Sequence, residues 1–158
     1  MHIELKKICV PTDFSPHAEQ ALRYGATMAA SFGAKLHLLH VVQDIDAFVT
    51  EPTGMAGWSA TEILDDLKKG AAEGLKETAN RLPAELQPVV QTVTHGIPFH
   101  EISRYAKQEG IDLIILGTHG RTGLKHFLLG SVAERVVRSA PCPVLTVRHP
   151  EHEFVIPE

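Results

Sequence analysis

Strand-like and helix-like segments alternate along most of this chain, and this alternation restricts the possible folds more than any other feature of the sequence. Short segments rich in Val, Ile and Leu are each followed by a stretch in which apolar residues recur every three or four positions. These are the patterns of buried strands and of helices with one apolar face. Four strand–helix units and a final strand predict an α/β fold, a doubly wound five-stranded parallel sheet with helices on both faces.

The expected strands contain many branched apolar residues and few turn residues: they are 7–12, 35–42, 89–94, 111–116 and 144–147. Segment 111–116 is almost entirely apolar, which is typical of a central strand covered on both faces. Residues 43–58 and 149–158 show no period, and we expect a loop and a loose C-terminal tail. The chain, 1–158, has the length of one domain, with an expected core at about 5–148.

Short polar signals mark where the expected helices begin. Ser15 before Pro16 predicts a helix start, because serine caps helices well and proline fits the first helical position. Ser59 and Glu62 have the spacing of a capping box. Ser131 is expected to cap a last helix that runs to residue 139.

Other residues indicate where helices end and which side faces the core. Gly33 and Gly110 stand where helices can end in a left-handed conformation. The apolar spacing further predicts that Phe32 and Leu67 belong to buried helix faces.

Composition excludes several classes of protein. A net charge of −4 argues against a globally basic nucleic-acid binder. The longest purely apolar run, 113–116, is far shorter than the ~20 residues of a membrane-spanning helix. Two cysteines cannot form a disulfide framework, so we expect a cytoplasmic protein. From the charge and the short apolar runs we expect no nucleic-acid and no membrane partner.

Two segments follow expected strands at the edge where open α/β sheets bind ligands. One is 11–13; the other is a glycine-rich loop, 117–130, that leads into the last helix. The loop contains neither a P-loop nor the Gly-x-Gly-x-x-Gly motif. Its glycines nevertheless allow backbone amides to approach an anion, and a helix N-terminus favours phosphate. Residues 113–133 contain no Asp or Glu, which fits an anion site; the alternative is a turn that merely needs glycine and carries a solvated basic face.

At this point the sequence resembles the universal stress proteins, in particular their nucleotide-binding branch. Gly117 and Gly120 are separated by two residues, Gly120 and Gly130 by nine, and Ser131 follows, as in that branch. The segments 11–15, 39–41 and 141–145 resemble the first loop, the second strand end and the last strand of the family. The resemblance covers about 7–148 and implies a Rossmann-like, adenine-nucleotide α-hydrolase-like sheet of order 3-2-1-4-5.

The resemblance also implies a nucleotide-binding site. Asp13 would lie beside the ribose and adenine, Val41 would offer backbone groups to the adenine edge, and Gly130 would help to cradle the phosphates. Gly123 stands where some ATP-binding relatives carry Asn. The implied site residues are Pro11, Thr12, Asp13, Val41, Leu116, Gly117, Thr118, His119, Gly120, Arg121, Thr122, Gly123, Gly130, Ser131 and Val132.

The function that follows is that of an ATP-binding regulatory or stress-response module rather than an enzyme. ADP or AMP could replace ATP, and Mg²⁺ would arrive with the nucleotide. The resemblance implies a homodimer through the last strand, 144–147. Two alternatives stay open: a slow ATPase or nucleotidyl-transfer enzyme on the same site, and a structural dimer that binds no nucleotide.

Several reactive residue types do not form a recognisable catalytic or metal site. The ten histidines lack metal-site spacing, and His37 and His40 should point to opposite faces of their strand. Cys9 is expected to be a small buried hydrophobe. The sequence therefore assigns no catalytic residue and no protein-held metal.

Overall fold

The computed structural model describes residues 3–43, 59–119 and 129–148. Its centre is a five-stranded, all-parallel sheet of order β3-β2-β1-β4-β5. The predicted sheet and its strand order are therefore confirmed. The strands are β1 (Lys7–Pro11), β2 (Lys35–Val42), β3 (Val90–His95), β4 (Leu113–Gly117) and β5 (Val144–Val147).

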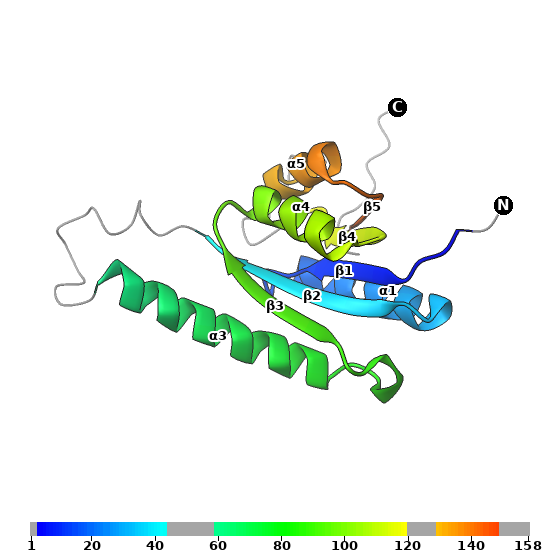
Figure 1. The fold of residues 1–158 in the computed structure, drawn as a ribbon, viewed down its shortest axis with the longest axis horizontal. Coiled ribbons are helices and arrows are strands. Elements are labelled where there is room, and N and C mark those ends of the chain that lie inside the picture. Colours follow the sequence, from blue (N-terminus) through cyan, green and yellow to red (C-terminus); the bar gives the residue numbers. More distant parts are fainter. Residues whose placement is uncertain (1–2, 44–58, 120–128, 149–158) are drawn as a thin grey trace, which may run out of the picture.

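Helices cover both faces of this sheet, so the chain forms three layers. Helices α1 and α3 pack on one face, and α4 and α5 pack on the other (Figure 1). A short 3-10 turn, η1, precedes β3. The bounds are α1 (Pro16–Phe32), α3 (Ala60–Asn80), η1 (Ala84–Leu86), α4 (Pro98–Glu109) and α5 (Ser131–Ser139).

Most helix ends lie where the sequence signals place them. The Ser15 side chain accepts a hydrogen bond from the Ala18 amide, and Ser59 and Glu62 form the complete capping box. Gly33 ends α1 in a left-handed conformation with a φ of 65°. These local contacts satisfy backbone groups that every helix terminus leaves without intrahelical partners.

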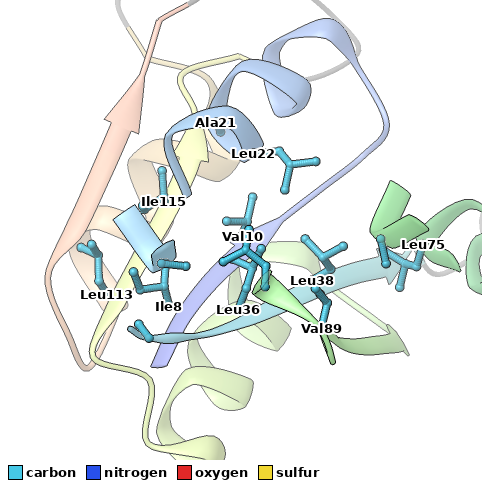
Figure 2. Packing of buried hydrophobic residues seen from close by; sticks show 14 of the residues in the cluster. Ile8, Val10, Ala21, Leu22, Leu36, Leu38, Leu75, Val89, Leu113 and Ile115 are labelled. Atoms are coloured by element: carbon cyan, nitrogen blue, oxygen red, sulfur yellow. The ribbon is translucent and has the colours of Figure 1, made fainter. Parts of the chain in front are cut away.

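The core divides into two apolar layers because successive strand residues point to opposite faces. Ile8 and Val10 of β1 face α1 and α3, together with Leu36 and Leu38 of β2 (Figure 2). Cys9 lies between them in sequence and belongs to the layer under α4 and α5. It is fully buried, as predicted.

Two predicted core residues are exposed instead. Phe32, at the end of α1, is 50% exposed, and Leu67 of α3 is 45% exposed. The reason for Leu67 is length: α3 has 21 residues, about 31 Å, and buries only residues of its second half, from Ala71 onward. Figure 1 shows its first turns beyond the carboxyl ends of β2 and β3, beside the site described next.

Among the described residues, no helix combines the length and apolarity that crossing a membrane would require.

Candidate functional site

A cavity of about 960 Å³ opens at the carboxyl ends of β1, β2 and β4. The chain winds from β1 to β2 and β3 on one side and reaches β4 and β5 on the other. Strand order therefore reverses between β1 and β4, and open α/β sheets bind ligands at such reversal points. Residues 66–71 of α3 and the first turns of α4 and α5 contribute the outer walls.

The structure brings together the predicted site residues that it describes. Eleven of the fifteen line this cavity: Pro11, Thr12, Asp13, Val41, Leu116, Gly117, Thr118, His119, Gly130, Ser131 and Val132. The other four, Gly120, Arg121, Thr122 and Gly123, lie outside the described residues. Segments from three distant parts of the sequence thus share one concave surface.

The turn between β1 and α1 is fixed by its own hydrogen bonds. The Thr12 amide donates to the Leu39 carbonyl at 2.8 Å, which ties the turn to β2. The Phe14 amide donates to Thr12 Oγ1 at 3.0 Å, and the Ser15 amide donates to Asp13 Oδ1 at 3.0 Å. The Asp13 side chain is thereby held beside the N-terminus of α1.

Gly117 permits close contact between β4 and α1. A Cβ atom at this position would lie 2.8 Å from the backbone oxygen of His17, which no side chain could tolerate. His17 and His119 face each other across the same junction, with ring centroids 5.7 Å apart. Glycine at the end of β4 therefore brings the His119 side of the cavity against the first turn of α1.

Gly130 makes a similar close approach at the start of α5. Its amide donates to the Thr118 carbonyl at 2.6 Å, and an added Cβ would lie 2.9 Å from that oxygen. Gly130 is the N-cap of α5, and Ser131 is its first helical residue. The prediction that Ser131 caps the helix is therefore wrong by one residue, because only glycine fits between Thr118 and the helix.

The N-terminus of α5 gives the cavity an anion-attracting end. The first amides of a helix lack intrahelical acceptors, and its dipole adds positive potential. Ser131, Val132 and Ala133 occupy these positions and line the cavity. No Lys or Arg is among the described lining residues. Within the described part of the wall, the groups suited to a phosphate are thus backbone amides and uncharged side-chain donors such as the Ser131 hydroxyl.

Sequence reasoning missed two carboxylates in the wall, Asp66 of α3 and Glu134 of α5. Glu134 is held by Arg138, with 3.0 Å between their charged atoms. Glu134 follows the acid-free segment 113–133 directly and lies only three residues after Ser131, so its closeness to a predicted site residue could have indicated its place in the wall. Asp66 gave no signal, because its place depends on how far α3 extends past the sheet.

Sequence reasoning also gave Phe14 and His40 no role in the site. Both line the cavity, and their rings stack with centroids 4.7 Å apart. His37, three residues before His40, instead shares a hydrogen bond with the Tyr105 hydroxyl under α4. The predicted opposite orientation of the two histidines is confirmed.

Burial determines the electrostatics of the reactive groups behind the cavity. It lowers the pKa of His37 below that of a free imidazole, which favours the neutral ring. It also raises the pKa of the Cys9 thiol far above its ordinary value, so this thiol is a poor nucleophile. The described residues contain no group of three or more His, Cys, Asp or Glu side chains arranged to hold a metal ion.

Comparison with known sequences matches this chain to one family. The model of the universal stress protein family matches residues 4–148. Universal stress protein MJ0531 of Methanocaldococcus jannaschii is 36% identical over 94% of this chain and 85% of its own length. Universal stress protein YxiE of Bacillus subtilis is also 36% identical, over 90% of this chain and 98% of its own.

Solved structures agree with the sequence comparison. The structure of MJ0577, a universal stress protein of Methanocaldococcus jannaschii, has a TM-score of 0.81 at 34% identity and covers 94% of this chain and 99% of its own. UspA from Lactobacillus plantarum has a TM-score of 0.79 at 30% identity and covers 93% of this chain and 100% of its own.

Proposed function

Since the chain belongs to the universal stress protein family, we propose that it binds an adenine nucleotide, foremost ATP, and acts as a nucleotide-dependent regulatory module in the stress response. One observation carries this proposal. The eleven described residues of the implied nucleotide site come from β1, β2, β4 and the start of α5, and they all line a single cavity. A volume of about 960 Å³ is within the range of small-molecule sites.

The two ends of the cavity suit the two ends of a nucleotide. Asp13, fixed by the Ser15 amide, offers a carboxylate to ribose hydroxyls or the adenine amino group. At the other end, Gly130 and Ser131 present the N-terminus of α5 to phosphates. The four glycine-loop residues from Gly120 to Gly123 belong to the proposed site by resemblance alone.

Two solved members of the family support adenine nucleotides as the ligand class. One universal stress protein was crystallised in complex with cAMP, and one from Arabidopsis thaliana with AMP bound. They are 23% and 18% identical to this chain, and at that level the likeness shows a shared fold alone. In those two proteins, a fold of this kind holds an adenine nucleotide.

Mg²⁺ would accompany ATP, and the donor set of the cavity is compatible with it. Mg²⁺ prefers oxygen ligands and usually keeps water and substrate phosphates as partners. Asp66 and Glu134 supply carboxylate oxygens in the wall. The same two carboxylates favour a second candidate function, a slow ATPase or nucleotidyl transferase, because phosphoryl transfer uses acidic groups to orient a nucleophile or a metal.

Assembly as a homodimer through β5 is part of the proposal. β5 (Val144–Val147) is an edge of the sheet, and its residues 144–146 are only half-buried. An unpaired edge can add a strand from a second copy across a two-fold axis.

The nucleotide proposal is tested by replacing Asp13 with alanine. Calorimetry should show ATP and adenosine binding weakened about tenfold, or about 1.4 kcal/mol, with inorganic tripolyphosphate unaffected. Asp112→Ala is the matched control, because the Asp112 carboxylate accepts from the Lys6 and Lys7 amides and does not line the cavity. Absence of nucleotide binding by the unaltered protein would overturn the proposal and leave the structural-dimer alternative.

A further inference from the structure

Two aromatic side chains of the cavity wall, Phe14 and His40, form a stacked pair directly behind the Asp13 turn. Their ring centroids are 4.7 Å apart and their planes differ by 21°. Phe14 belongs to the turn itself, whereas His40 comes from β2 and is only 8% exposed. The stack therefore joins the turn that carries Asp13 to the neighbouring strand.

A hydrogen bond from His40 holds the base of this turn. Nδ1 of His40 lies 2.8 Å from the Thr12 carbonyl oxygen. A carbonyl oxygen can only accept, so Nδ1 carries the hydrogen of this bond. The bond fixes the orientation of the peptide unit that joins Thr12 to Asp13. The preceding peptide unit, which joins Pro11 to Thr12, is fixed separately, because the Thr12 amide donates to the Leu39 carbonyl.

Phe14 has a backbone conformation that is costly for an aromatic residue. Its φ is 62°, in the left-handed region that favours glycine. Such a conformation persists where the surrounding contacts over-determine it, and it often occurs at functional sites. Here it reverses the chain within the turn, so that the Ser15 amide can bond to the Asp13 carboxylate at 3.0 Å.

Helix α3 confines the other side of the Phe14 ring. A Cβ atom at Gly74 would lie 2.9 Å from Cζ and 3.1 Å from Cε1 of Phe14. The ring can occupy its place because α3 has no side chain there. Gly74 is not a lining residue of the cavity, and the three atoms nearest an added Cβ all belong to Phe14, so Phe14 is the first group that a side chain at position 74 would displace.

We propose that His40 and Phe14 are positioning residues for Asp13. Stacking, the Thr12 hydrogen bond and the contact with Gly74 hold the turn in the conformation that presents the Asp13 carboxylate to the nucleoside. The pair therefore determines the affinity for the nucleoside part of the ligand and not for its phosphates. This inference rests on the proposed function, which assigns the nucleoside to Asp13.

The main test is a pair of His40 variants measured by calorimetry against adenosine, ATP and inorganic tripolyphosphate. His40→Leu should weaken adenosine and ATP about tenfold, whereas tripolyphosphate binding stays within about twofold. His40→Asn should recover most of the loss. The asparagine amide nitrogen stands at nearly the place of Nδ1 and can donate to the same Thr12 carbonyl.

A matched control on the same strand separates positioning from general destabilisation. His37 is also buried and hydrogen-bonded, but it contacts Tyr105 on the opposite face of the sheet and does not line the cavity. His37→Leu should lower the midpoint of thermal unfolding and leave adenosine affinity unchanged.

Gly74→Ala provides a second variant that does not remove a buried polar group. Alanine favours a helix more than glycine does, so the fold should be retained. The new Cβ must displace the Phe14 ring, and adenosine should bind about tenfold more weakly at normal thermal stability. This variant keeps the inference testable if His40→Leu fails to fold.

The outcomes separate this inference from the function on which it rests. If the unaltered protein binds neither adenosine nor ATP, the proposed function fails, and the positioning role fails with it. If the unaltered protein binds both, and His40→Leu and Gly74→Ala bind adenosine equally well, only the positioning role is overturned. Equal losses for adenosine and tripolyphosphate would also overturn it, because they would indicate a general disturbance of the site.

Discussion

At the scale of single residues, glycine determines how the two sides of the cavity approach each other. Gly117 and Gly130 both stand where a Cβ atom would come within 3 Å of a backbone oxygen. At each position, the backbone of one segment packs directly against the backbone of another. Among the residues that the structure describes, the proposed phosphate end therefore depends on the absence of side chains at these two positions rather than on a charged side chain.

This dependence predicts the effect of Gly130→Val. The added side chain must push the start of α5 away from Thr118, which displaces the first helical amides from the proposed phosphates. We expect ATP and tripolyphosphate binding to weaken at least about tenfold by calorimetry. Gly33→Ala is the control: its φ is 65°, so it should lower stability, but nothing lies near the added atom and ATP should bind normally. Unchanged ATP affinity in folded Gly130→Val would contradict the assignment of the phosphate end.

Residue identity predicted part of this arrangement. The spacing of Gly117, Gly120 and Gly130 located the loop, and the strand end located Asp13. The partners of these residues could not be predicted, because they depend on contacts between distant segments. The His40 contact with Thr12 joins residues 28 positions apart, and Gly74 meets Phe14 across 60 positions. No local pattern encodes such a contact.

At the scale of elements, α4 is fastened to β3 by a buried acid. Glu101 accepts hydrogen bonds from Thr94 of β3, at 2.9 Å, and from Arg104 in the next turn of α4. The hydrogen bond from Arg104 is the main reason that the pKa of Glu101 is lower than that of a free glutamate. A carboxylate whose pKa falls on folding stabilises the folded state above its ordinary pKa.

The sign of this effect predicts a pH dependence. Glu101→Gln should lower the free energy of unfolding at neutral pH, because the amide cannot form the ion pair with Arg104. As pH falls through the lowered pKa, the carboxylate becomes protonated and the stabilisation is lost, so the two proteins should converge in acid. Urea unfolding at several pH values measures the difference. A stability gap of constant size from neutral to acid pH would contradict the ionic role of Glu101.

A second prediction at this scale concerns β5 as a dimer edge. The Pro143 carbonyl accepts from the amide of Ile114 in β4, and the Val147 carbonyl accepts from the amide of Thr118, directly after β4. Because alternate residues of a strand bond to opposite sides, Leu145 also faces β4, and the Thr146 amide faces outward. Thr146→Pro should therefore give a folded monomer by light scattering, since proline is tolerated at an outward-facing edge position. Leu145→Pro is the comparison and should lose stability. A folded Thr146→Pro dimer would place the interface elsewhere.

The sequence defined most elements well because their signals are local. Caps at Ser15 and Ser59 and the glycine at position 33 mark the ends of helices that the structure confirms. The errors occurred where burial depends on neighbours that the pattern does not specify. Leu67 has the correct helical spacing for the core, yet α3 extends past the sheet at that point and leaves it exposed.

At the scale of the whole molecule, the winding of the sheet puts the proposed ligand site at one edge and the proposed dimer surface at another. The cavity lies at the carboxyl ends of β1, β2 and β4, whereas β5 forms a lateral edge. The strand–helix alternation predicted the parallel sheet with helices on both faces, and the family resemblance supplied its strand order. Together they pointed to the carboxyl ends of the strands as the edge for a proposed ligand site. It could not predict the outer walls, because the directions of α3 and α5 follow from packing.

The whole cavity also bears on whether bound ATP is retained or hydrolysed. Hydrolysis needs a group that orients a water molecule at the γ-phosphate, usually with a metal ion. Glu134 lies at the proposed phosphate end, but it is engaged by Arg138. Asp66 of α3 lies opposite Lys69 of the same helix, with 4.0 Å between their charged atoms. Because each of these two carboxylates already pairs with a cation of its own helix, we expect bound ATP to be retained rather than hydrolysed.

We therefore predict turnover of at most a few ATP per hour, against ~1–1,000 per second for typical enzymes. A steady-state phosphate-release assay with Mg²⁺ measures this rate. Gly130→Val is the control for contaminating ATPases, because phosphate release by a contaminant would be the same in the variant as in the unaltered protein. Glu134→Gln and Asp66→Asn should leave the slow rate unchanged. Release faster than about one phosphate per second, lost in Gly130→Val and in either carboxylate variant, would favour the enzyme alternative and identify the acid that orients the water.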